Sequence, residues 1–220
     1  MIRKQIITRG FISFLVLCLV FFLPARTLKY WEGWVYIGII FVCAAWTITY
    51  FLKYDPDLLE RRMRIKEKEK EQKHIIRIAS LLFLPTFIIP GFDHFYKWSE
   101  IPGLLIIAGE ILVLAGYLIV IRVFRENSYT SRIIEVNPGQ KVISSGPYAV
   151  VRHPMYSGTM LMYGFTPLAL GSWWAFIGSG MIFILIIFRI ITEERFLSDN
   201  LEGYKEYLQK TRYRLIPGIW

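Results

Sequence analysis

Long apolar runs separated by short polar segments dominate this chain. Residues 10–28 and 34–52 form the first two runs, and the second contains no charged residue. Further apolar runs cover residues 75–91, 101–121, 156–170 and 173–188. A helix needs about 20 apolar residues to cross the hydrocarbon core of a bilayer. The pattern therefore predicts an all-α integral membrane protein with about six transmembrane helices.

The last two runs differ from the others because each is shorter than a perpendicular crossing requires. Gly171 and Ser172 separate residues 156–170 from residues 173–188. A glycine-containing break between two apolar segments is typical of a tight turn. We therefore expect these two segments to form a short helical hairpin.

The basic residues are distributed unevenly among the polar segments. The chain has 26 Lys and Arg residues, and six crossings with both termini on one side leave only Arg26, Lys29 and Lys97 on the other. Because basic residues accumulate on the cytoplasmic side of membrane proteins, both termini are predicted to be cytoplasmic. The expected location is the plasma or inner membrane in a prokaryote and the endoplasmic reticulum in a eukaryote.

Composition narrows the possible partners. A net charge of +9 would suit a nucleic-acid-binding protein, but basic residues interleaved with whole apolar spans are better explained by topology and by anionic lipid head groups. We expect a lipid bilayer as partner and no nucleic acid. Cys18 and Cys43 lie inside apolar runs, and the histidines are far apart in the sequence. Neither a disulfide framework nor a metal site is therefore predicted.

The charged segment 53–74 separates the second apolar run from the third. Its mixed basic and acidic residues are typical of a solvated helix on the membrane surface, with a specific lipid-binding patch as the alternative. We expect N-terminal transmembrane helices with this cytoplasmic loop in residues 1–100, and the functional region in residues 101–220. Glu110 lies near the middle of the fourth run, where a carboxyl is either functional or bonded inside the bundle.

The candidate chemistry is concentrated in residues 146–158, where the string GPYAVVRHPMYSG leads into the fifth apolar run. Arg152 and His153 supply hydrogen-bond donors, and Tyr148 and Tyr156 supply aromatic faces and hydroxyls. Glycine and proline fix turns around them. From spacing alone, the stretch is equally well explained as an amphipathic loop with basic residues at the head groups.

A second candidate element lies at the end of the last apolar run. Arg189 and Glu193 are one helical turn apart and share a helix face. They either form an i,i+4 salt bridge at the membrane exit or act separately, with the carboxylate serving a cationic ligand and the guanidinium an anionic one. The predicted topology brings this pair to the same side of the membrane as residues 124–155 and the C-terminal tail.

Taken together, these motifs resemble the isoprenylcysteine carboxyl methyltransferase family, which is related to the membrane phospholipid methyltransferases. The resemblance is carried by Gly-Pro-Tyr-x-x-x-Arg-His-Pro-x-Tyr-x-Gly, the apolar hairpin, the Glu193–Glu194 pair, and the tail strings EGYKEY and RLIP. It covers residues 101–220. It implies a membrane enzyme that uses S-adenosyl-L-methionine, bound in a cytoplasmic pocket built from residues 124–155 and the C-terminal tail.

The resemblance also implies roles for individual residues. Arg189 corresponds to the family's arginine that faces the reacting group of the substrate, and is the predicted catalytic residue. Where this chain has Gln140, the family often has histidine. The predicted cofactor contacts are Gln140, Val142, Ile143, Tyr148, His153, Pro154, Met155, Tyr156, Glu193 and Glu194.

Charge arguments favour an anionic methyl acceptor. A carboxylate is already ionised at neutral pH and needs mainly orientation, which a permanently charged arginine provides. An ammonium would have to lose a proton and would be repelled by Arg189. We therefore expect methylation of a carboxylate on a lipid-tailed or small membrane substrate. The alternatives are a phospholipid (ethanolamine) N-methyltransferase, a related membrane NADPH-dependent reductase, and a non-catalytic scaffold.

Overall fold

The computed structural model describes residues 2–63 and 85–220 of the 220-residue chain. Its long helices are α1 (Ile2–Ala25), α2 (Trp31–Tyr54), α5 (Gly103–Glu126), α6 (Pro154–Ala169) and α7 (Ala175–Asn200). The shorter helical elements are α3 (Pro56–Met63), the 3-10 turn η1 (Gly146–Ala149), α8 (Tyr204–Lys210) and residues 85–96. No strand occurs in the described ranges, so the all-α prediction is confirmed for this part of the chain.

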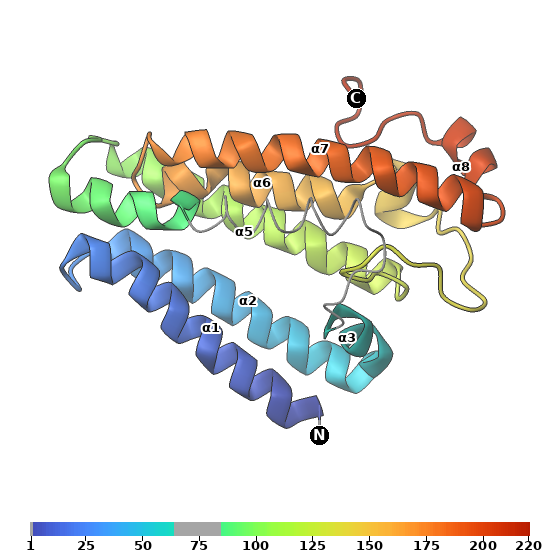
Figure 1. Ribbon diagram of the computed structural model, residues 1–220, viewed down its shortest axis with the longest axis horizontal. Helices are drawn as coiled ribbons and strands as arrows, with labels where there is room; N and C mark the ends of the chain where they lie inside the picture. The colour runs from blue at the N-terminus through green and yellow to red at the C-terminus, as the bar shows by residue number, and fades with distance from the viewer. Residues whose placement is uncertain (1, 64–84) are drawn as a thin grey trace.

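The long helices form one bundle with two distinct ends (Figure 1). α5 packs against α6, α6 against α7, and the α1–α2 hairpin contacts the bundle through α2 and α5. One end carries α3, the connection between α5 and α6, and α8 (Figure 1); we call it the pocket end. The link between α1 and α2 and the turn between α6 and α7 lie at the opposite end (Figure 1).

Four helices in the described part are long and apolar enough to cross a membrane. They are Gln5–Ala25 within α1, and the whole of α2, α5 and α7. α6 is shorter, with 16 residues. The predicted span at residues 75–91 lies mostly outside the described residues. The chain therefore has the helices of a membrane protein, while the count of six crossings and the cytoplasmic orientation stay predictions.

The hairpin expected near the end of the chain is present, but one of its arms is longer than predicted. The chain turns at Gly171, whose φ of +68° suits a residue without a Cβ. α7 then continues to Asn200 and has 26 residues, so the prediction of a short second segment was wrong. The polar residues that follow Phe188 continue the helix, because their side chains bond to α6 and to the tail.

α5 and α6 touch through their backbones where small residues face each other. A Cβ atom on Gly116 would lie 2.6 Å from the carbonyl oxygen of Gly158. Closer to the opposite end, a Cβ atom on Gly109 would lie 2.5 Å from the backbone nitrogen of Ala169. Small residues allow such close helix approach in membranes. These two contacts fix the start of α6 relative to the end of α5, where the candidate site lies.

Candidate active site

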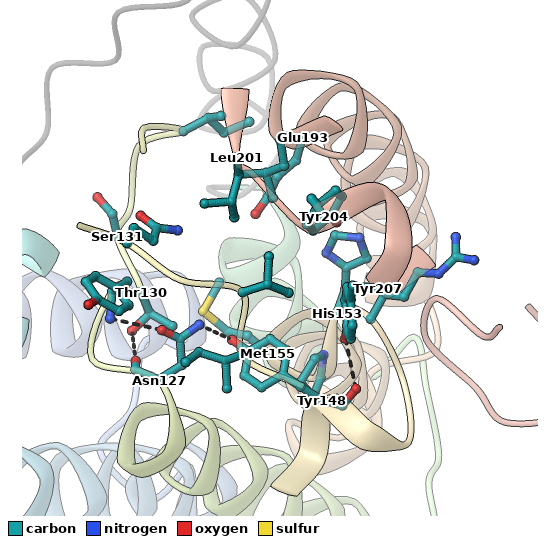
Figure 2. A pocket seen from close by; sticks show the side chains of 18 of the residues that line it. Asn127, Thr130, Ser131, Tyr148, His153, Met155, Glu193, Leu201, Tyr204 and Tyr207 are labelled. Carbon is teal, nitrogen blue, oxygen red and sulfur yellow. Dashed lines mark hydrogen bonds between the residues drawn. The ribbon is translucent and has the colours of Figure 1, made fainter. Parts of the chain in front are cut away.

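A cleft of about 810 Å³, including its open mouth, lies at the pocket end. Figure 2 shows Thr130 and Ser131 from the α5–α6 connection on one side of the cleft, and Tyr204 and Tyr207 from α8 on another. The cleft thus lies between the connection, the ends of α6 and α7, and the tail; that it holds a cofactor stays a prediction.

The structure brings nearly all of the predicted site residues to this cleft. The predicted cofactor contacts that line it are Gln140, Val142, Ile143, Tyr148, His153, Pro154, Met155, Tyr156 and Glu193. Glu194 and Arg189 are not among the lining residues. Both lie directly behind the lining, Glu194 against His153 and Arg189 against Tyr156.

The hydroxyl of Tyr156 joins Glu193 to Arg189. It donates to Oε2 of Glu193 at 2.6 Å and accepts from Nε of Arg189 at 2.8 Å. Nη2 of Arg189 also donates to the carbonyl oxygen of Arg132 at 2.7 Å. Among the described residues, Arg189 and Glu193 form no direct ion pair, so the simple i,i+4 salt bridge is not what the structure shows. A buried tyrosine, 8% exposed, instead separates a carboxylate facing the cleft from a guanidinium behind it.

Glu194 is bound within the protein rather than presented to the cleft. Oε1 of Glu194 lies 3.3 Å from both Nη1 of Arg152 and Nε2 of His153, and Oε2 accepts from Nε of Arg214 at 2.9 Å. Glu193 lines the cleft and Glu194 does not. In the structure Glu194 therefore anchors the tail, and its predicted cofactor contact stays a prediction.

The tail holds the 148–157 stretch in place by further hydrogen bonds. The backbone N–H groups of Arg152 and His153 donate to the carbonyl oxygens of Tyr213 and Arg214, both at 2.9 Å. From α8, the hydroxyl of Tyr207 donates to the carbonyl oxygen of Tyr148 at 2.8 Å. The motif is therefore tied to the tail and to α8 at several points along its backbone.

The connection orients the aromatic side of the cleft. Nδ2 of Asn127 donates to the hydroxyl of Tyr148 at 3.0 Å (Figure 2). Burial raises the pKa of Tyr148 well above its ordinary value, and the bond from Asn127 only partly opposes this shift, so the hydroxyl stays neutral. Gln140 closes its own turn, since its Oε1 accepts from the backbone nitrogen of Asn137 at 2.9 Å.

Arg62 is a residue of this region that sequence reasoning missed. It belongs to α3, and its Nη1 donates to the carbonyl oxygen of Ser131 at 3.0 Å and lies 3.7 Å from Sδ of Met155. Its guanidinium lies 4.9 Å from the ring centroid of Phe124. The interpretation of segment 53–74 as a solvated surface helix is therefore wrong for Arg62. No sequence spacing could have placed it, because the contact depends on how α3 packs against the connection.

Glu110 lies in α5, away from the cleft, and is 4% exposed. Within the described ranges, neither of its carboxyl oxygens has a hydrogen-bond partner. The expectation of a carboxyl bonded inside the bundle is therefore not met, and the cleft does not include it.

A model of a known protein family matches the part of the chain that contains most of the cleft. Residues 104–203 match the family model described as phospholipid methyltransferase. The matched segment contains α5, the connection, α6 and α7, and so most of the cleft lining. A search of curated proteins finds no match for this chain. The family match indicates a membrane methyltransferase and does not distinguish between methyl acceptors.

Proposed function

We propose that this protein is an S-adenosyl-L-methionine-dependent membrane methyltransferase that methylates a carboxylate on a lipid-tailed or small membrane substrate, as the isoprenylcysteine carboxyl methyltransferases do. The observation that carries the proposal is the Tyr156 hydroxyl between Glu193 and Arg189. The Glu193 carboxylate faces the cleft and suits a cationic ligand. The Arg189 guanidinium lies behind Tyr156 and suits an anionic ligand.

The residues lining the cleft fit the chemistry of the cofactor. Its amino-acid end carries an ammonium group, which Glu193 suits, and a carboxylate, which the His153 ring or backbone N–H groups of residues 140–143 suit. Tyr148 and Tyr204 add aromatic faces to the lining. When bound, the cofactor supplies an electrophilic methyl group.

The contribution of the protein is mainly position and charge. A carboxylate acceptor needs no general base at neutral pH, so no residue of the cleft has to remove a proton. Arg189 is held behind the lining, at Nε by Tyr156 and at Nη2 by the Arg132 carbonyl, and we infer that its fixed positive charge serves an anionic acceptor. Holding the acceptor close and aligned accounts for most of the rate enhancement in such a displacement.

Phospholipid amine methylation is the second candidate, favoured by the family match over residues 104–203. The two candidates differ in the bond that forms, because a carboxylate gives an ester and an amine gives a methylated amine. Their products are therefore separable by treatment with base.

The test is methyl transfer from labelled S-adenosyl-L-methionine into membranes that contain the wild-type protein or Glu193→Gln. We expect label in the lipid extract with the wild type, released by mild base as volatile methanol, and a large loss with the variant. Label that stays non-volatile after treatment with base would assign the phospholipid amine reaction instead. If calorimetry detects no binding of the cofactor to the purified wild type, the methyltransferase proposal is wrong.

A further inference from the structure

A groove separate from the cleft lies on the outside of the bundle, between α2 and α5, which pack side by side (Figure 1). It has a volume of about 820 Å³, including its open side. Its apolar lining residues are Val42, Cys43, Trp46, Leu118 and Ile121, and Arg122 and Arg125 complete the lining. None of these residues lines the cleft. Both helices are long and apolar enough to cross a membrane, so the hydrocarbon chains of a bilayer would contact this groove directly.

The two arginines lie at the level expected for lipid head groups. α5 has 24 residues and therefore a length of about 36 Å, which exceeds the hydrocarbon core of about 30 Å. Arg122 and Arg125 belong to its last two turns. On the α2 side, the Trp46 ring stacks on that of Tyr50 at 5.2 Å, and the Tyr50 ring centroid lies 5.5 Å from the Arg125 guanidinium. Tryptophan and tyrosine are enriched where hydrocarbon meets head groups, so the groove leads from an apolar region to the head-group level.

No carboxylate neutralises these arginines in the part of the chain that the structure describes. No acidic residue lines the groove, and no described carboxylate forms an ion pair with Arg122 or Arg125. The adjacent Glu126 instead accepts a hydrogen bond from the hydroxyl of Ser145 at 2.6 Å. Arg125 lies over the Tyr50 ring, a contact that leaves its N–H groups for an anion. Guanidiniums bind phosphate oxygens through paired N–H groups of this kind.

We propose that this groove binds an anionic phospholipid, with one acyl chain along its apolar residues and the phosphate against Arg122 and Arg125. Two cations suit a lipid of net negative charge better than a zwitterionic one, because they repel the ammonium of a zwitterionic head group. The site does not depend on the proposed function, since it shares no residue with the cleft. The α1–α2 hairpin contacts the bundle through α2 and α5, so a lipid bound between these helices should also stabilise the fold.

A general role of the arginines as membrane anchors predicts something different. Any exposed arginine near the end of a spanning helix would then attract anionic lipids equally. Arg195 is exposed and lies at a similar distance from the end of α7 as Arg122 does from the end of α5, but it does not line the groove. Arg195→Gln is therefore a matched control that removes the same charge and leaves the groove unchanged.

The experiment uses the purified full-length protein in a non-ionic detergent and phospholipids with brominated acyl chains, which quench tryptophan fluorescence on contact. Brominated phosphatidylglycerol is compared with brominated phosphatidylcholine. The chain has seven tryptophans, so the difference between wild type and Trp46→Phe gives the quenching at Trp46. An arginine near anionic lipid contributes roughly fivefold in affinity. We expect half-quenching of Trp46 at a mole fraction of phosphatidylglycerol roughly fivefold to twentyfold lower than that of phosphatidylcholine.

The variants assign this preference to the groove. Replacing both Arg122 and Arg125 by Gln should remove it, replacing both by Lys should keep part of it, and Arg195→Gln should keep it within about twofold of wild type. In the wild type, phosphatidylglycerol should also raise the melting temperature more than phosphatidylcholine does.

The same measurements can overturn the inference. Equal quenching of wild-type Trp46 by the two lipids overturns it without relying on any arginine variant. Equal losses of preference in Arg195→Gln and in the double Gln variant overturn it in favour of general anchoring. Quenching by a brominated fatty acid at a lower mole fraction than by phosphatidylglycerol overturns it in favour of a single-chain acid as the ligand.

Discussion

Replacing Tyr156 by phenylalanine removes a single oxygen atom that connects the two charged groups of the candidate site. The ring and its packing against Ile186 and Ile190 are retained, so the fold is not expected to change. Oε2 of Glu193 loses a donor at 2.6 Å, and Nε of Arg189 loses an acceptor at 2.8 Å. The variant therefore tests whether the orientation of these two groups, rather than their presence, matters for function.

The expected size follows from the two bonds. A hydrogen bond to a charged group contributes about 1.5–3 kcal/mol, and the Tyr156 hydroxyl makes two of them. Water replaces part of this loss because the cleft is open, so we expect a net loss of about 3 kcal/mol in transition-state stabilisation. At 1.36 kcal/mol per factor of ten, this corresponds to about a hundredfold lower kcat/KM.

The assay combines methyl-transfer kinetics with calorimetric measurement of cofactor affinity. Tyr129→Phe is the control, because Tyr129 also lines the cleft but its hydroxyl makes only an exposed 3.3 Å bond to the carbonyl oxygen of Gly139. In a Glu193→Gln background, Tyr156→Phe should lower kcat/KM by a smaller factor, because the charged hydrogen bond between Tyr156 and Glu193 is already lost. Wild-type kcat/KM and cofactor affinity in Tyr156→Phe, or full additivity with Glu193→Gln, would refute the reasoning.

Three further outcomes are expected. Glu194→Gln leaves Arg152 and Arg214 without their carboxylate partner. It should lower the free energy of unfolding by roughly 3 kcal/mol and make the tail accessible to limited proteolysis. An unchanged proteolysis rate would contradict the anchoring role of Glu194. Gly116→Ala puts a Cβ 2.6 Å from the Gly158 carbonyl oxygen. It should lower the free energy of unfolding by about 1–3 kcal/mol, which thermal unfolding measures as a lower melting temperature. Gly103→Ala is the control, because a Cβ at Gly103 has no heavy atom within 4 Å and should leave the melting temperature unchanged. Burial is the main cause that raises the pKa of Tyr207 to about 12, above the value of about 10 in the unfolded chain. The neutral Tyr207 side chain therefore contributes fully to stability below pH 10, and this contribution is lost between pH 10 and pH 12. Denaturant titrations across this range should show a smaller decrease in the free energy of unfolding for Tyr207→Phe than for the wild type.

The parts of the site that the sequence could predict are those written as contiguous strings. Residues 153–156 and Tyr148 reach the cleft because one turn and one helix start carry all of them. Helix periodicity also held a usable signal that separates Glu193 from Glu194, since neighbouring positions point in different directions. Arg62 could not be predicted, because its place depends on the packing of α3 against a connection about 70 residues later in the chain.

The fold was predictable to a similar degree and for a physical reason. Apolar runs mark the centres of helices, so residues 34–52 predicted α2 to within three residues at either end. They do not mark helix ends, where polar residues continue the helix and make specific bonds. α7 extends from the predicted end at Phe188 to Asn200 for this reason, and the extension carries Glu193 and Glu194.

The backbone contact between Gly116 and Gly158 has a consequence for the interpretation of random mutagenesis. α6 starts at the cleft and is seated on α5 about one turn later, at Gly158. A substitution at this contact is therefore expected to shift His153 and Tyr156 without touching either. Loss-of-function variants should therefore cluster in two places, in the cleft and along the α5–α6 seam. The seam variants will resemble catalytic mutants in activity screens, and only their lowered thermal stability will identify them.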